Sequence, residues 1–404
     1  MTVALSKLSG GLRVVSDSMD SVETVTLGAW IEVGTRDEDA KNNGISHLLE
    51  HMAFKGTDNR SAKQIVEEIE TVGGHLNAYT SRDHTAYYAK VLKENASLAI
   101  EIVADILQHS TLDEVELERE KKVIIQEIHQ SLDTPDDVVF DYFQETAFPN
   151  QAIGRPVLGT EIIVRSLTPD ILKKYMAEHY SSPHIVLAAA GNIEHDALVE
   201  LVQNAFKVFP EEIKNNRDPA IYIGGDRYEI RDLEQSHVLF GMEGISFTDD
   251  DFHALSVFST LLGGGMSSRL FQEIREKRGL AYNIYSYIQC YVDSGLFGIY
   301  AGTGKENIEI LIPLIKKEIE KLCLSISEDE IIRARTQIKS SLLMSLESTS
   351  SRCEQVARQT MIYGHPLSLN KVIANIESVN EASLKCIGER LLLSKPTLTT
   401  LGPN

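Results

Sequence analysis

Two histidines and a glutamate fall within five consecutive positions of this chain, as His47, Glu50 and His51 in the sequence His-Leu-Leu-Glu-His. Residues four apart lie on one face of an α-helix, so the imidazoles of His47 and His51 can reach the same metal ion. Glu50 projects beside them and could handle the proton of a metal-bound water. This order, H-x-x-E-H, is the reverse of the commoner H-E-x-x-H metal motif. The spacing therefore predicts a metal site with its own base.

The alternative to a metal site is an amphipathic helix whose apolar side chains face the core, namely Leu48, Leu49, Met52 and Phe54. The two histidines would then be ordinary, partly buried residues. A catalytic zinc needs a third protein ligand and an open position for water. The metal interpretation therefore requires one more His, Cys or carboxylate on a rigid element.

A helix that could supply this ligand is predicted over 113–131, a stretch rich in helix-forming residues and free of Gly and Pro. Glu120 and Glu127 lie seven positions apart in it, about 20° short of two full turns, so they share one face. The alternative is that both carboxylates are solvated, which is the usual state of Glu on a helix surface.

Together the two segments resemble the pitrilysin-type, or inverzincin, peptidase family. The sequence HLLEHMAFKGT at 47–57, followed downstream by EKKVIIQE at 120–127, is similar to half-length members such as the catalytic subunits of processing peptidases and their bacterial relatives. All five site positions of the family pattern match. The resemblance implies one zinc ion per chain, bound by His47, His51 and Glu127. It also implies that Glu50 is the general base and that Glu120 is an outer carboxylate that supports the site.

The same resemblance implies substrate contacts in both halves of the chain. Residues 74–80 resemble the family's edge strand, which holds an extended substrate by main-chain pairing, and Asn77 and Ala78 are the best matched positions. In the second half, Arg275 and Tyr282 within REKRGLAY match an Arg and a Tyr that contact the substrate backbone. The alternative for this pair is a surface Arg and a core Tyr.

The length of 404 residues suits two domains better than one core. The polar stretch 210–226, which has two Pro and two Gly, predicts a linker over 211–226. The linker would join a zinc-binding half at 1–210 to a related half at 227–404 that contributes substrate contacts. The resemblance implies an α+β fold of two such halves, each an antiparallel sheet with helices packed on one face.

An internal repeat supports this organisation. The apolar pattern of 90–107 recurs at 302–319, but no second H-x-x-E-H follows the first, and the aligned positions carry Ala334 and Ser341 instead of Glu120 and Glu127. We therefore predict a duplicated fold in which only the first half binds metal.

Composition excludes some partners. With 43% hydrophobic and 24% charged residues the chain is typical of soluble globular proteins, and its charge of −20 argues against nucleic acid or anionic membranes. This charge would favour basic peptides by steering, or would merely maintain solubility. We expect a cytoplasmic protein, because the start lacks the pattern of an export signal, no apolar run is long enough to span a membrane, and the four cysteines form no C-x-x-C.

The leading hypothesis is a zinc-dependent endopeptidase that cleaves short or unfolded peptides, held as an added β-strand in an enclosed chamber. The resemblance implies that two subunits pair, as a homodimer or as a heterodimer with a related subunit. One alternative is a non-catalytic member that serves as a scaffold or peptide-binding partner; an intact set of ligands and base disfavours it. Another is a lyase of the S-ribosylhomocysteine type, but those short chains use a catalytic Cys, and no Cys precedes Cys290 here.

Overall fold

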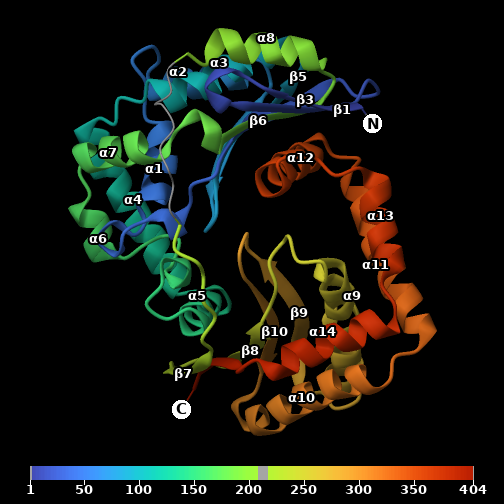
Figure 1. Cartoon of the computed structure of the whole chain (residues 1–404). Helices are drawn as coiled ribbons and strands as arrows, with labels where there is room; N and C mark the ends of the chain where they lie inside the picture. Colours follow the sequence, from blue (N-terminus) through green and yellow to red (C-terminus); the bar gives the residue numbers. More distant parts are fainter. Residues whose placement is uncertain (1, 208–216, 404) are drawn as a thin grey trace. The chain divides into compact units, whose positions relative to one another are not determined.

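The computed structural model describes residues 2–207 and 217–403, which form two units (Figure 1). The first unit comprises Met1–His129, Arg155–Asp218 and Met344–Leu367, and the second comprises Gln130–Gly154, Pro219–Leu343 and Ser368–Asn404. Each unit is built on one β-sheet. The predicted linker at 211–226 falls in part outside the described residues, and the predicted domain boundaries stay a prediction.

The sheet of the first unit has six strands in the order β1-β2-β6-β3-β5-β4. Its strands are β1 (Thr2–Lys7), β2 (Arg13–Ser18), β3 (Thr24–Ile31), β4 (His75–Thr80), β5 (Thr85–Leu92) and β6 (Ile185–Gly191). Neighbouring strands are antiparallel except β2 and β6, which are parallel. β4 and β5 form a hairpin, and β4 lies at an edge of the sheet.

Helices from the first half of the sequence cover one face of this sheet (Figure 1). They are α1 (Ile45–Ala53), α2 (Ala62–Thr71), α3 (Ala96–Gln108), α4 (Glu114–Leu132), α6 (Glu161–Ser166), α7 (Pro169–His179) and α8 (His195–Ala205). Alternate residues of a strand point to opposite faces. In β6, Leu187 and Ala189 accordingly face these helices, whereas Val186 and Ala188 face the other side.

The other face of the first sheet is covered by α12 (Thr349–Tyr363), which comes from near the end of the chain. Cys353 and Val356 of this helix pack in one cluster with Trp30 of β3. The Trp30 Nε1–H donates to Glu354 at 2.9 Å, and the Tyr79 hydroxyl of the edge strand donates to the same carboxylate at 2.7 Å. α12 therefore holds β4 from the face of the sheet opposite to the helices of the first half.

The sheet of the second unit has five strands in the order β7-β11-β8-β10-β9. Its strands are β7 (Gly225–Ile230), β8 (Ser236–Glu243), β9 (Ala281–Cys290), β10 (Gly295–Thr303) and β11 (Thr397–Gly402), of which β7 and β11 are parallel. The helices of this unit are α5 (Pro135–Ala147), α9 (Phe252–Gly263), α10 (Ile308–Leu324), α11 (Glu328–Ser345), α13 (Leu369–Ser378) and α14 (Glu381–Leu393). α9, α10 and α14 pack on one face, and α5 packs on the other.

The two sheets share one topology. Without β1, the order β2-β6-β3-β5-β4 corresponds strand for strand to β7-β11-β8-β10-β9, which confirms two related α+β halves. Two details differ from the expected fold. Each sheet contains one parallel pair, because the returning strand arrives through helices and so can run either way. Each sheet also has a helix on its second face, α12 or α5, contributed by the other half of the sequence. No helix among the described residues is long and apolar enough to cross a membrane.

Candidate metal centre

The helix that carries His47, Glu50 and His51 is α1, and a buried carboxylate fixes its start. Glu38 accepts hydrogen bonds from the backbone N–H of Gly44 at 2.8 Å and of Ser46 at 2.9 Å. These N–H groups have no partner within the helix, and a carboxylate there also complements the helix dipole. Burial raises the pKa of Glu38 to about 7. Glu38 therefore orients the first turn of the helix, immediately before His47.

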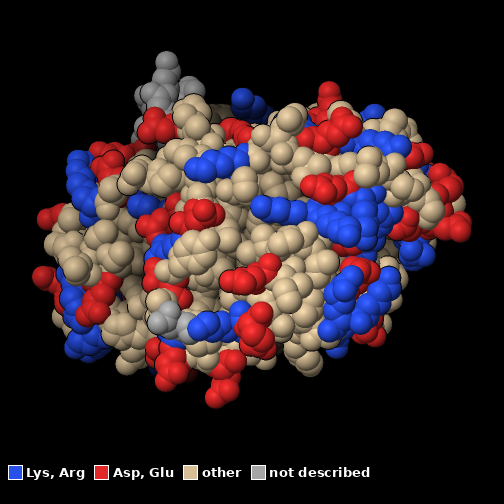
Figure 2. All heavy atoms as spheres, turned by 90° about the horizontal axis from the view of Figure 1, so that it is seen from below, with Lys and Arg blue, Asp and Glu red and all other residues tan. Residues whose placement is uncertain are grey.

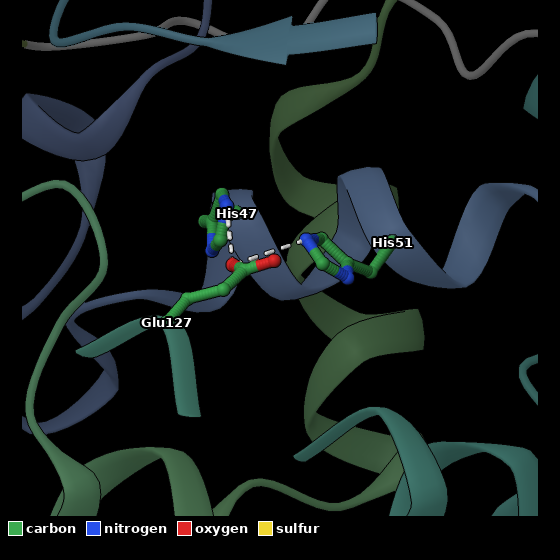
Figure 3. Close-up of side chains that lie close together, drawn as sticks. All are labelled: His47, His51 and Glu127. Atoms are coloured by element: carbon green, nitrogen blue, oxygen red, sulfur yellow. Dashed lines mark ion pairs between the residues drawn. The ribbon is translucent and has the colours of Figure 1, made fainter. Parts of the chain in front are cut away.

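The structure brings His47, His51 and Glu127 together, with the Glu127 carboxylate between the two imidazoles (Figure 3). Glu127 Oε2 lies 3.7 Å from His47 Nε2 and 3.5 Å from His51 Nε2. Within residues 2–207 and 217–403, this is the one group of His, Cys, Asp or Glu side chains that converges in this way. The helix face predicted for Glu127 thus meets the helix face predicted for the histidines.

The donor set and its spacing fit zinc. Atoms bound at about 2.0–2.2 Å in a tetrahedron lie roughly 3.3–3.6 Å apart, close to the two distances from Glu127. Burial lowers the pKa of His47 to about 4, so its ring is neutral at pH 7 and a lone pair is available. His47 Nδ1 is buried without a hydrogen-bond partner in the described part of the chain. Two imidazoles and one carboxylate leave the fourth position open, as a catalytic zinc requires.

Glu120 lies behind the cluster and contacts one of its histidines. Its Oε2 is 3.1 Å from His51 Nδ1, and its Oε1 accepts from Lys55 Nζ at 2.7 Å. A carboxylate at Nδ1 keeps the proton on that nitrogen, so that Nε2 is free to bind a metal. Glu120 is buried, which excludes the alternative of a solvated helix carboxylate.

We expect Glu120→Gln to weaken zinc affinity or turnover by about 10- to 100-fold without preventing folding, because the partner that orients His51 loses its charge. Competition with a chromogenic chelator measures the affinity, and circular dichroism checks the fold. Glu118→Gln is the matched control, because Glu118 is on the same helix with its side chain 61% exposed. Unchanged zinc affinity and turnover in Glu120→Gln would refute the orienting role.

Glu50, the predicted base, lies on α1 next to His51. Its Oε2 accepts a hydrogen bond from Thr80 Oγ1 at 2.6 Å. Burial raises the pKa of Glu50, and the hydrogen bond from Thr80 opposes this shift. Because Thr80 ends β4, the contact joins the motif helix to the edge strand.

The predicted substrate residues of the first half, Asn77 and Ala78, lie in the middle of this edge strand. The backbone N–H of Ala78 donates at 2.9 Å to Oδ1 of Asn77 and not to a neighbouring strand. This amide therefore belongs to the open edge, where the side chain of Asn77 occupies the position that the carbonyl of an added strand would take.

The predicted substrate residues of the second half contact each other. The guanidinium of Arg275 lies over the ring of Tyr282 at 5.4 Å and over the ring of Phe271 at 4.5 Å. Tyr282 is 77% exposed, so the alternative of a core tyrosine is wrong. The role of this pair in substrate binding stays a prediction.

Three residues of the site could not be singled out from the sequence: Glu38, Thr80 and Glu354. Each contacts its partner only after folding, and each is a common residue type without a motif around it. The signal that existed for Thr80 was its place at the end of the predicted edge strand. Nothing local indicated that Glu354, far along the chain, would bond Tyr79.

Comparison with known proteins agrees with this geometry. The family model "Insulinase (Peptidase family M16)" matches residues 13–161, and the model "Peptidase M16 inactive domain" matches residues 166–338. The second match covers most of the half in which no metal cluster is found among the described residues.

Several relatives match over nearly the whole chain. An "uncharacterized zinc protease" of Rickettsia bellii is 39% identical over 401 residues, covering 99% of this chain and 97% of that one. The mitochondrial-processing peptidase subunit beta of Homo sapiens is 36% identical over 410 residues, covering 98% and 83%. The crystal structure of a protease from Helicobacter pylori has the same fold, with a TM-score of 0.93, 23% identity and coverage of 100% and 99%.

The resemblance inferred from the H-x-x-E-H segment and the Glu127 segment is thus confirmed over the full chain. The converging side chains lie where that resemblance places them. The chain belongs to the M16 peptidase family, and it is a metallopeptidase similar to bacterial zinc proteases and to the processing-peptidase beta subunit.

Proposed function

We propose that this protein is a zinc-dependent endopeptidase that cleaves short or unfolded peptides, which it binds as an added strand on the open edge of β4. The observation that carries the proposal is the hydrogen bond from Thr80 of that strand to Glu50 of the motif helix. This contact puts a base next to the edge at which an extended peptide can pair. One zinc ion per chain is proposed, since the described residues contain one ligand cluster.

In this proposal His47, His51 and Glu127 hold the metal, and Glu120 and Glu38 keep the ligand helix in position. A bound zinc supplies a Lewis acid that polarises the scissile carbonyl and lowers the pKa of water to about 7. Burial keeps His47 neutral and Glu120 fixes the tautomer of His51, so that both rings bind as ligands.

Glu50 moves the protons. Its carboxylate accepts a proton from the attacking water, while the hydrogen bond from Thr80 holds the side chain in position. The same carboxylic acid then protonates the leaving amine nitrogen, which completes hydrolysis of the peptide bond. Burial raises the pKa of Glu50, which makes its carboxylate a stronger base towards the proton of the attacking water.

The edge strand selects for extended backbone. When a peptide pairs with β4, one of its carbonyl groups replaces the side chain of Asn77 as the acceptor of the Ala78 N–H. Such main-chain pairing demands little of the peptide sequence. Segments that are already paired within a folded protein cannot supply such a strand.

We therefore expect cleavage of a protein in its unfolded, alkylated form at a rate at least about 100-fold above that of its native form, because the native form must first open, at a cost of several kcal/mol. A small disulfide-bonded protein, native or reduced and alkylated, provides the matched pair of substrates, and mass spectrometry identifies the products. Equal cleavage of both forms would contradict binding as an added strand.

Net charge favours basic peptides, because a protein of charge −20 attracts them over a distance. On the face drawn in Figure 2, acidic and basic side chains are interspersed among uncharged ones. On this face, therefore, the attraction of basic peptides does not come from a single acidic patch. Pairing with a second subunit and enclosure of the peptide in a chamber stay predictions of the family resemblance.

A further inference from the structure

A surface hollow of about 330 Å³ lies between the end of α2 and the start of β4, outside the metal cluster. Three of its lining residues are apolar: Val66, Ile69 and Leu76. The exposed side chains of Glu70 and His75 belong to the lining as well. The hollow thus combines an apolar wall with one carboxylate and one imidazole, beside the strand proposed to bind peptide.

The backbone at one end of this hollow is held in a defined conformation. Gly73 has φ of 67° and donates to the carbonyl of Glu70 at 2.9 Å, while Gly74 donates to the carbonyl of Ile69 at 2.9 Å. This pair of bonds is a Schellman cap, which needs glycine at the left-handed position. A Cβ on Gly74 would lie 2.7 Å from Val91 Cγ1, so a larger residue does not fit. The hollow is therefore a fixed feature of the fold.

The register of β4 relates the hollow to the candidate base. Leu76, Ala78 and Thr80 alternate with the other strand residues, so they point to one face, the face where Leu76 lines the hollow and Thr80 bonds Glu50. In a strand paired with β4, the residues opposite Leu76 and Thr80 point to that face as well. They are four residues, or about 13 Å, apart.

Charge defines what the hollow accepts. In the described part of the chain, no cation pairs with the carboxylate of Glu70, and the negative end of the α2 dipole lies at the same place. Both features favour a cation. The apolar wall suits the aliphatic stem of a long side chain, as Lys and Arg have.

On the basis of the proposed peptide binding at β4, we propose that this hollow is a specificity subsite for a Lys or Arg side chain of the substrate. The side chain belongs to the peptide residue four positions from the one opposite Thr80. Val66, Ile69 and Leu76 contact its stem, and Glu70 pairs with its charged end. The subsite produces a preference for Lys or Arg at one position of the peptide, whereas attraction by net charge favours basic residues at every position.

The test uses an uncharged parent peptide with one cleavage site, in which Lys, norleucine or Glu is placed at each position in turn. At one position only, we expect Lys to exceed norleucine by about two- to fivefold in kcat/KM at low salt, as an exposed ion pair allows, and the preference to fade as salt rises. In Glu70→Lys, Glu should be preferred over Lys at that same position. Glu67→Lys is the matched control, since Glu67 is exposed on the same helix, pairs with Lys63 and does not line the hollow.

A parallel measurement separates this inference from the proposed function. Fluorescence anisotropy of the labelled Lys and Glu peptides on the full-length Glu50→Gln protein reports binding without turnover. A positional Lys preference in binding, without cleavage by the wild type, would support the subsite and overturn the peptidase proposal. Cleavage with no positional preference, with equal preference at all positions, or with a preference that Glu70→Lys leaves unchanged would overturn the subsite.

Discussion

Replacing Glu50 by Gln is expected to lower kcat/KM for peptide hydrolysis by roughly 100- to 10,000-fold while zinc content stays unchanged. The amide keeps the size of the side chain and can still accept the hydrogen bond from Thr80, but it cannot take a proton from water. Steady-state kinetics on a quenched fluorescent peptide, together with metal analysis of the same sample, measures both quantities.

The matched control for this variant is Glu67→Gln, which makes the same chemical change at an exposed position. It should retain wild-type rates. Loss of zinc from Glu50→Gln would show that Glu50 is a ligand, and near-normal hydrolysis would remove it as the base.

Replacing the metal ligand His47 by Ala is expected to lower peptide hydrolysis to a similar extent, but through loss of zinc and not through loss of the base. Wild-type protein should contain one zinc per chain, and His47→Ala should lose it at chelator concentrations that leave the wild type loaded. The loss of affinity should exceed the roughly 10- to 100-fold that an outer-shell partner costs. Because a ligand that binds only the folded state stabilises it, added zinc should raise the Tm of the wild type and not that of His47→Ala.

His365→Ala is the control for this experiment, because His365 is an exposed imidazole outside the cluster. It should keep both zinc and activity. Two tightly bound zinc ions per wild-type chain would contradict the asymmetric duplication, since the second half would then hold a site of its own.

The parts of the site that could be predicted from the sequence are those fixed within one helix. The spacing of His47, Glu50 and His51 determines their common face wherever the helix is placed. The same holds for Glu120 and Glu127 on α4, although pairing the two helices required the family resemblance. The strands were predictable for a similar reason, since β6 and the β4–β5 hairpin are short apolar or alternating runs bounded by turn residues.

The parts that could not be predicted depend on contacts between distant segments. Glu38 reads as one acidic residue in a polar loop, and only folding places it against the start of α1. By its place in the sequence, α12 belongs to the predicted second half, whereas its apolar side chains pack on the first sheet. Periodicity shows that a helix has an apolar face but not which sheet that face will meet.

α5 and α12 each cover the sheet of the other half of the sequence, and this has a consequence for folding during synthesis. The chain passes from one unit to the other five times, at residues 129/130, 154/155, 218/219, 343/344 and 367/368. The motif helix is translated by residue 53, yet the helix that covers the second face of its sheet ends only at Tyr363. Until then Trp30 and Val186 have no cover from α12 on the nascent chain. A chain released before α12 is made therefore presents the apolar second face of its first sheet to other proteins.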